Sequence, residues 1–374
     1  MSQSPRVIVF GPAYLDRVLR VDRPLVDQSC GGPLDQSAEG RWEPGEGLAL
    51  VDPLGSILAI TLARDWPGPT GTVRLARPLL PTAGGWERSV ATASWHDDLG
   101  GMGAGYASAL PGTLVSAVGS DDDPTSRWIV ARLASEKIAH WPVRVPGHPA
   151  DWTLLVTSGT FGDKLPVGFR GCHAAIEALS PWLEEPCDLR VVAALPNRLA
   201  AEALRSPGAR IRFFAPAMRN MGDSDPPLVA FGEAIDFLSC NRREWDVLSG
   251  QADLAARVPL VAITDGPRGS LIRYHRPDRS LRELRVEAFP RLRPPADTNR
   301  AGEAYASTLL KELLAAGWEP GPVDEDLLKQ AATRASAAAA LVLDHERFGF
   351  PSSEEVDRAL RIGSVGGDDS VSLG

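Results

Sequence analysis

Hydrophobic residues fall into short runs that end at glycine or proline and alternate with segments in which apolar positions recur at helical spacing. The run "RVIVFG" at residues 6–11 is typical of a buried strand that stops at a glycine turn. Comparable runs predict strands at residues 113–119, 151–159, 188–196, 209–216 and 234–241, and two strands within 259–275. Helices are predicted at residues 125–139, directly after residue 241, from Glu303 to Gly317 and at about 324–343. This alternation predicts an α/β fold with a mostly parallel central sheet covered by helices on both faces.

Between residues 27 and 95 the chain becomes dense in glycine and proline. Within this segment, "LALVDPLGSILAITLA" at 48–63 predicts a hairpin. We interpret 27–95 as an insert of short strands and loops, because it leaves no room for a separate helical core. The last residues, 364–374, predict a disordered tail, so the sequence predicts one domain over residues 1–363.

Composition narrows the class of protein. The net charge of −9 argues against a nucleic-acid partner or an anionic membrane surface, which need clustered cations. No run reaches the ~18 apolar residues of a membrane helix, and we expect no signal peptide at the start. The scattered cysteines and histidines show no metal-ligand spacing, so we expect reduced thiols, no structural zinc and a cytoplasmic protein. The "SDDD" segment at 120–123 is interpreted as a solvated helix cap.

The candidate chemistry lies in "PPADTNRAGEAYAS", residues 294–307, where a glycine turn leads into a helix. Backbone N–H groups of residues 300–303 would be unpaired donors that can bind an anion. Glu303 would stand beside that anion, and amides next to a carboxylate suit phosphoryl transfer to a hydroxyl. The alternative is a plain helix cap with an acidic first-turn residue, which spacing alone favours.

The order of motifs adds a second argument. The same stretch resembles the "DTTGAGDAF" signature of the ribokinase/PfkB carbohydrate kinase family, with matches at Asp297, Thr298, Ala301, Gly302 and Ala304. Further segments resemble that family in its own order: "VIVFGPAYLD" (7–16), "GGMGAGYASAL" (100–110), "AVGSDDD" (117–123), "NRREWDVLSG" (241–250) and "ITDGPRG" (263–269). Each segment alone is weak, but together they cover nearly the whole chain apart from the insert and the tail.

The resemblance implies a ribokinase-like three-layer sandwich with a small β-lid, ATP and Mg²⁺ as cofactors, and a sugar or nucleoside-like small molecule as acceptor. It implies that Glu303 is the catalytic base and that Ala301 and Gly302 supply anion-hole amides beside Arg300. The positions implied at the substrate are Asp16, Gly100, Gly101 and Gly105, and those implied at the nucleotide are Asn241, Thr264, Gly266, Gly269, Asp297 and Thr298. Glu244, with Asn241, is implied to bind Mg²⁺. Lids in this family often form subunit contacts, so the insert either supports a homodimer or is a surface elaboration.

Three positions depart from the family pattern. Glu303 replaces an aspartate, and its extra methylene displaces the carboxylate by roughly 1.5 Å. Arg300 replaces a glycine; if a positive φ is needed there, the arginine costs roughly 1–2 kcal/mol. Its guanidinium either clamps the transferred phosphate or fills the phosphate site. Gly105 replaces a sugar-binding asparagine. Arg170, in "GFRGCH", either meets an anionic substrate group or is an ordinary surface arginine, the more common case.

Two functions follow from this sequence. The first is an ATP-dependent kinase acting on a hydroxyl of a sugar or nucleoside-like molecule, favoured because residue 303 remains a carboxylate. The second is a catalytically impaired PfkB-like pseudoenzyme that binds nucleotide or metabolite, favoured by the changes at Arg300 and Gly105.

Overall fold

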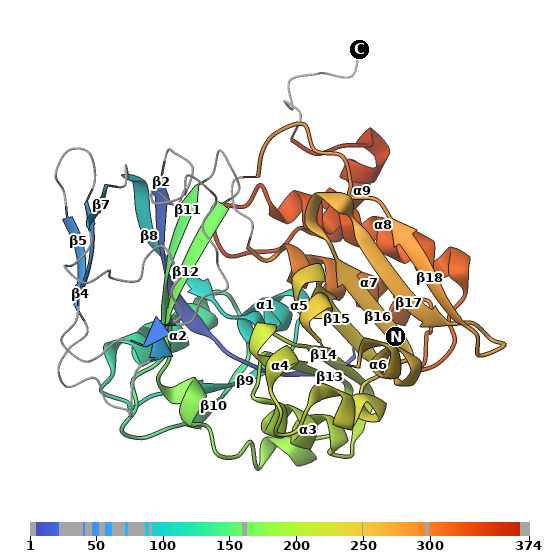
Figure 1. Cartoon of the computed structure of the whole chain (residues 1–374), viewed down its shortest axis with the longest axis horizontal. Helices are drawn as coiled ribbons and strands as arrows, with labels where there is room; N and C mark the ends of the chain where they lie inside the picture. Colours follow the sequence, from blue (N-terminus) through green and yellow to red (C-terminus); the bar gives the residue numbers. More distant parts are fainter. Residues whose placement is uncertain are drawn as a thin grey trace.

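A computed structural model of the chain describes residues 5–21, 40–41, 47–51, 57–61, 72–73, 87–89, 92–158, 163–248, 250–295 and 299–366. Its two largest sheets have nine and four strands, and the four-stranded sheet stands beside one end of the nine-stranded one (Figure 1).

The nine-stranded sheet forms the centre of the molecule, with strand order β10-β9-β1-β13-β14-β15-β16-β17-β18. Its strands are β1 (Val7–Phe10), β9 (Thr113–Val118), β10 (His140–Arg144), β13 (Cys187–Ala193), β14 (Ala209–Ala215), β15 (Phe237–Asn241), β16 (Leu260–Thr264), β17 (Ser270–His275) and β18 (Leu281–Val286). Neighbouring strands are parallel from β10 to β16, and only β17 and β18 join antiparallel. The predicted mostly parallel sheet is therefore confirmed.

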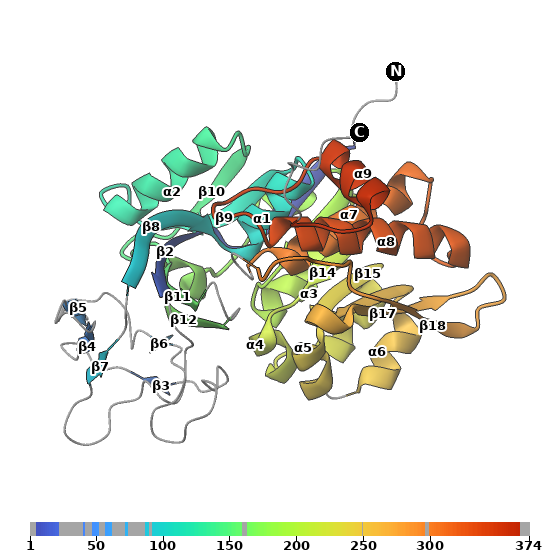
Figure 2. The same cartoon turned by 90° about the horizontal axis from the view of Figure 1, so that it is seen from above.

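Helices cover both faces of this sheet, as the sequence predicted. The helices are α1 (Met102–Ala109), α2 (Pro124–Ser135), α3 (Asn197–Arg205), α4 (Met218–Gly222), α5 (Arg242–Val247), α6 (Gln251–Arg257), α7 (Ala301–Ala315), α8 (Glu325–Val342) and α9 (Ser353–Ile362). Figure 2 shows α1, α7, α8 and α9 on one side and α3, α4, α5 and α6 on the other. Apolar strand residues are buried between these two layers, as in the fully buried run of β1.

Two helix starts illustrate how local sequence sets these elements. Asp123 caps α2, and its carboxylate accepts hydrogen bonds from the N–H groups of Thr125 (3.3 Å) and Ser126 (2.8 Å), which confirms the cap interpretation of the "SDDD" segment. Helix α7 begins at Ala301, two residues before the predicted start, and ends at Ala315 just before Gly317.

The four-stranded sheet, called the small sheet below, has the order β12-β11-β2-β8. Its strands are β2 (Tyr14–Val21), β8 (Thr92–Gly100), β11 (Trp152–Ser158) and β12 (Asp163–Phe169). Strand β2 follows β1 after three residues, and β8 leads directly to α1, so this sheet adjoins the carboxyl end of the central strands. It is our candidate for the β-lid that the resemblance implies.

The glycine- and proline-rich segment falls between β2 and β8, and most of it lies outside the described residues. The described parts are the short strands β3 (Gly40–Arg41), β4 (Gly47–Val51), β5 (Ile57–Thr61), β6 (Thr72–Val73) and β7 (Glu87–Ser89). Strands β4 and β5 pair antiparallel, which confirms the hairpin predicted at 48–63. Near the other end of the chain, Val365 is buried and bridges to Arg291, whereas residues 367–374 of the predicted tail lie outside the described residues.

Candidate active site

A cavity of about 510 Å³ lies where the small sheet meets the carboxyl ends of the central strands. In a parallel α/β sheet, ligands bind at the carboxyl ends of the strands, close to the point where the strand order reverses. Here that point is β1, because β9 lies on one side of it and β13 on the other. The volume is in the usual range for a small-molecule site. The residues that line it come from the small sheet, the start of α1, the ends of β15 and β16, and the start of α7.

The start of α7 faces the cavity through residues 299–303, called the 299–303 turn below. Arg300 is the N-cap residue and has a left-handed backbone, with φ 67° and ψ −4°. The turn thus requires the positive φ considered in the sequence analysis, which costs a non-glycine residue about 1–2 kcal/mol. The Arg300 side chain makes no capping hydrogen bond, and the N–H groups of Ala301, Gly302 and Glu303 belong to the first turn of α7. Such N–H groups can bind an anion.

The side chain of Glu303 extends from this turn toward α1. A Cβ atom placed on Gly105 would lie 3.3 Å from Glu303 Cγ and 3.7 Å from Glu303 Oε1. The first distance is shorter than most real Cβ contacts, so the side chain of Glu303 already borders the space that a side chain at position 105 would need. Two of the departures from the family pattern, Gly105 and Glu303, are therefore in contact.

The guanidinium of Arg300 is held toward strand β8. Its Nη1 donates to Asp98 Oδ2 at 3.3 Å, and the two side chains are only 10% and 4% exposed. Its Cζ also lies 6.0 Å from the centroid of the Phe348 ring. Asp98 is shared with Arg132 of α2, whose Nη2 is 3.6 Å from Asp98 Oδ1. Arg300 lines the cavity, but Asp98 does not, so this ion pair joins the cavity wall to the base of the small sheet.

The residues expected at the substrate lie around the turn from β8 to α1 and on the neighbouring strand β2. A Cβ atom on Gly100 would lie 2.0 Å from Asp16 Oδ2, so the glycine makes room for that carboxylate. Gly101 has φ 94°, and a Cβ there would lie 2.4 Å from Pro12 O. Asp16, Gly100, Gly101 and Gly105 all line the cavity. The paired glycines of "GGMGAG" thus permit a close approach of chain segments beside the Asp16 carboxylate.

On the opposite side, Asn241, Glu244 and Thr264 line the cavity. Asn241 caps α5: its Oδ1 accepts from Glu244 N at 2.9 Å, while Glu244 Oε2 accepts from Asn241 N at 2.9 Å. The N-x-x-E motif therefore forms a capping box at the cavity edge.

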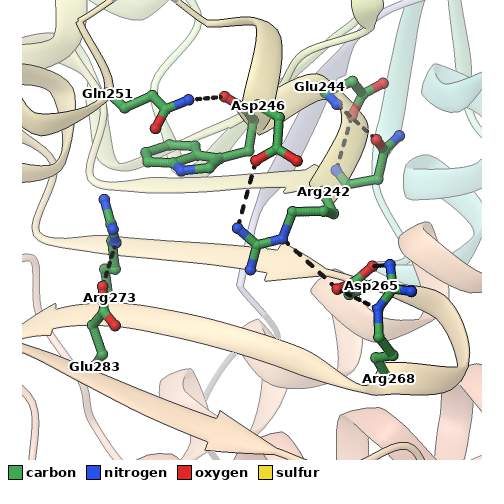
Figure 3. Close-up of polar contacts among 10 residues, drawn as sticks. Arg242, Glu244, Asp246, Gln251, Asp265, Arg268, Arg273 and Glu283 are labelled. Atoms are coloured by element: carbon green, nitrogen blue, oxygen red, sulfur yellow. Dashed lines mark hydrogen bonds and ion pairs between the residues drawn. The ribbon is translucent and has the colours of Figure 1, made fainter.

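The adjoining turn is fixed by charged side chains. Figure 3 shows Arg242 between Asp246 and Asp265, with both nitrogen–oxygen distances at 3.7 Å. Arg268 binds Asp265 at 2.7 Å and 3.0 Å, and hydrogen bonds from Arg268 are the main reason that the pKa of Asp265 is lowered. This network orders the loop between β16 and β17.

The two motif glycines of that loop do not line the cavity. Gly266 and Gly269 have φ 53° and 82°, and a Cβ on Gly269 would lie 2.1 Å from Val286 O. Their observed contribution is to the shape of the turn, whereas Thr264 faces the cavity. The remaining nucleotide-site candidates, Asp297 and Thr298, lie outside the described residues.

Several cavity residues were missed by the sequence analysis: Tyr14, Leu99, Met102, Tyr106, Thr153, Leu155, Pro216, Ser239, Cys240, Asn299 and Phe348. Tyr106 had the clearest available signal, because it directly follows Gly105 in the glycine segment. Burial, and then the charges of Glu303 and Glu244, raise the pKa of Tyr106 well above its ordinary value, so its hydroxyl stays protonated. Arg170, for which a surface role was the more common expectation, also lines the cavity.

The described part of the chain holds no group of three or more His, Cys, Asp or Glu side chains arranged for a metal ion. A Mg²⁺ ion bound to a nucleotide would need only one or two protein carboxylates, because phosphates and water complete its shell. Glu244 is the carboxylate that the N-x-x-E motif brings to the cavity. Among the described helices, none is long and apolar enough to cross a membrane.

The sheet order and the small sheet at the carboxyl edge define a ribokinase-like fold, as comparison with solved structures shows. Ribokinase from Giardia lamblia superposes with a TM-score of 0.65 at 19% identity, over 96% of this chain and 100% of that one. The nucleoside kinase of Methanocaldococcus jannaschii, an archaeal member of the ribokinase family, gives 0.62 at 15% identity, over 96% and 98%. Ribokinase from Arabidopsis thaliana, solved with ribose and ATP, gives 0.61 at 16%, over 96% and 99%.

These superpositions establish the fold, and they confirm the fold that the sequence resemblance implied. No family model matches the sequence, and no curated protein matches it in a sequence search. The function must therefore be argued from the cavity.

Proposed function

We propose that this protein is an ATP-dependent kinase that phosphorylates a hydroxyl of a sugar or nucleoside-like small molecule. The observation that carries this proposal is the shared cavity. One wall holds the Asp16 carboxylate, the opposite wall holds Asn241 and Glu244, and the α7 start with Glu303 lies at the same cavity. In support, structural neighbours were solved with ribose and ATP and with inosine.

Each group has a role that its chemistry allows. The Asp16 carboxylate accepts hydrogen bonds from acceptor hydroxyls and orients them. Glu303 takes the proton of the attacking hydroxyl, while the N–H groups of Ala301 and Gly302 stabilise the negative charge that grows on the transferred phosphoryl group. Mg²⁺, when bound, neutralises phosphate charge, and Glu244 with Asn241 would hold it.

A second candidate, a pseudoenzyme that binds nucleotide or metabolite without transfer, is favoured by one observation. Arg300 occupies a left-handed position that suits glycine, and its side chain is committed to a buried ion pair with Asp98. A turn fixed in this way could serve binding alone. We favour the kinase because Glu303, the only acidic residue in the first turn of α7, also borders the cavity.

The test is ADP release by the purified protein with Mg-ATP and a panel of sugars and nucleosides. Glu303→Gln should lower kcat by at least about 100-fold while ATP affinity is kept, because the general base is lost and the fold is not. Glu319→Gln is the matched control, since Glu319 lies after α7 in an exposed pair with Arg210.

Three outcomes separate the candidates. Release of ADP that depends on both an acceptor and Glu303 supports the kinase. Activity that survives Glu303→Gln would remove Glu303 from the role of base. Clear ATP binding without turnover on any acceptor would favour the pseudoenzyme.

A further inference from the structure

The small-sheet wall of the cavity carries a cation, Arg170, which follows β12. Its side chain is 24% exposed and lines the cavity beside Tyr14 and Thr153. The guanidinium carbon lies 4.3 Å from the centroid of the Tyr14 ring, a close stacking distance. Nη1 donates to Thr153 Oγ1 at 3.4 Å. The guanidinium is thus positioned by contacts on the small sheet.

A glycine on β12 completes this arrangement. A Cβ atom on Gly168 would lie 2.6 Å from Arg170 Nη2 and 2.8 Å from Arg170 Cζ. The Arg170 guanidinium therefore packs against the backbone of Gly168 on β12 and also contacts the ring of Tyr14. Any larger residue at position 168 would push it out of this place.

The charge of Arg170 is only loosely matched. Its ion-pair partner Asp151 is 1% exposed, and Asp151 Oδ2 is 3.9 Å from Arg170 Nε, which is too far for a hydrogen bond. Asp151 Oδ1 instead accepts from the N–H groups of Gly171 and His173, both at 3.0 Å. Burial lowers the pKa of His173 to about 3 and raises that of Asp151.

The two arginines that line the cavity therefore differ in how closely a carboxylate binds them. Among the described residues that line it, Arg170 and Arg300 are the two with a positive charge, and Arg300 is hydrogen-bonded to Asp98. The lining carboxylates Asp16, Glu244 and Glu303 would repel an anionic ligand. A ligand with an acidic group would need Arg170, whose planar N–H donors match carboxylate and phosphate oxygens.

We propose that Arg170 binds an anionic group of the acceptor. The acceptor would then be a polyol or nucleoside derivative that carries a carboxylate or phosphate away from the hydroxyl that reacts. This inference rests on the proposed kinase function and narrows its substrate class. The competing role for Arg170 is structural support of Tyr14 and Asp151, which the experiment must distinguish.

Calorimetric titration without ATP tests binding separately from catalysis. The probes are matched pairs: D-gluconate against D-glucose, ribose 5-phosphate against ribose, and inosine 5′-monophosphate against inosine. We expect the acidic member of at least one pair to bind at least 10-fold more tightly than its neutral partner. Tighter binding of gluconate would indicate a carboxylate ligand, and tighter binding of the phosphorylated probes would indicate a phosphate ligand.

Two variants assign this preference to the guanidinium. Arg170→Met keeps an apolar chain over Tyr14 and should lower affinity for the acidic probe by about 10- to 100-fold, with the neutral probe unchanged. Gly168→Ala keeps the charge but displaces it, so it should lower acid affinity several-fold. Arg6→Met, which alters an exposed pair with Glu185, is the control and should change neither affinity.

The proposal is overturned if no acidic probe binds, if the neutral members bind as tightly, or if Arg170→Met weakens both members of a pair equally. Should Arg170→Met fail to fold, Gly168→Ala gives the same decision. Acid-selective binding without ADP release would support Arg170 as the anion-binding group and contradict the kinase, so the bound acid would be a ligand and not an acceptor. Turnover of neutral acceptors without acid selectivity would support the kinase and overturn this inference.

Discussion

Two helix starts line the cavity, and their cap residues differ. At α5, Asn241 and Glu244 cap the helix with two reciprocal hydrogen bonds of 2.9 Å. At α7, the cap residue Arg300 contributes no side-chain cap and is instead tied to Asp98, 202 residues away in the chain. The α5 start is thus stabilised by its own side chains, whereas the cap residue of α7 is held by an ion pair with a distant strand.

The same contrast holds for the family pattern. The N-x-x-E side keeps that pattern, while the 299–303 turn departs from it at Arg300 and Glu303. Both departures have structural partners: Glu303 borders the space at Gly105, and Arg300 pairs with Asp98. These contacts can be tested by changing both members of each pair.

The largest effect should come from Gly105→Asn, because the new side chain would enter the space beside Glu303 Cγ and Oε1. A shift of the carboxylate by about 1 Å costs on the order of 100-fold in kcat. Adding Glu303→Asp should recover at least about 10-fold, because the shorter side chain vacates that space. Kinetics of the four proteins in this double-mutant cycle measures the coupling, and unfolding free energies give a second readout independent of turnover. Additive effects would show that the two positions act independently.

A second effect, on stability rather than on turnover, is expected for Asp98→Asn, which removes the buried carboxylate that Arg300 and Arg132 share. Removing one partner of a buried ion pair costs about 3 kcal/mol of unfolding free energy. Urea denaturation measures this, with Asp121→Asn as the control, since Asp121 pairs with Arg144 on an exposed surface and should cost less than about 1 kcal/mol. Equal losses in the two variants would contradict the structural role of the Asp98–Arg300 pair.

The smallest effect concerns the other helix start. Asn241→Ala should lower the unfolding free energy by about 1 kcal/mol through the lost cap, and should also weaken Mg-ATP binding several-fold. Asp324→Ala is the matched control, because Asp324 caps α8 through the N–H of Leu327 at 2.9 Å and does not line the cavity. If both variants bind Mg-ATP equally well, Asn241 is a cap without a role in binding.

The sequence predicted the features that depend on local pattern. Short apolar runs that end at glycine or proline predicted central strands, and helical spacing predicted α2, α7 and α8. These features could be predicted because burial and capping depend on residues that are close in the sequence. The α7 start was placed two residues late, since a helix with Arg300 as its N-cap lacks the usual signal.

Contacts between segments that are far apart in the sequence could not be predicted from local sequence patterns. Nothing in "GFRGCH" shows that Gly168 makes room for Arg170, or that Tyr14 supplies the ring above it, because both follow from how β12 and β2 are placed in the small sheet. The partnership of Arg300 with Asp98 likewise depends on the register of β8, which periodicity does not reveal.

That partnership has a mechanical consequence. Strand β8 carries Asp98 two residues before the glycine pair at 100–101, where the small sheet gives way to α1. Any swing of the small sheet about these glycines must stretch or bend its ionic link to the start of α7. A movement that widens the cavity mouth would therefore also pull on the 299–303 turn through the buried Asp98–Arg300 pair.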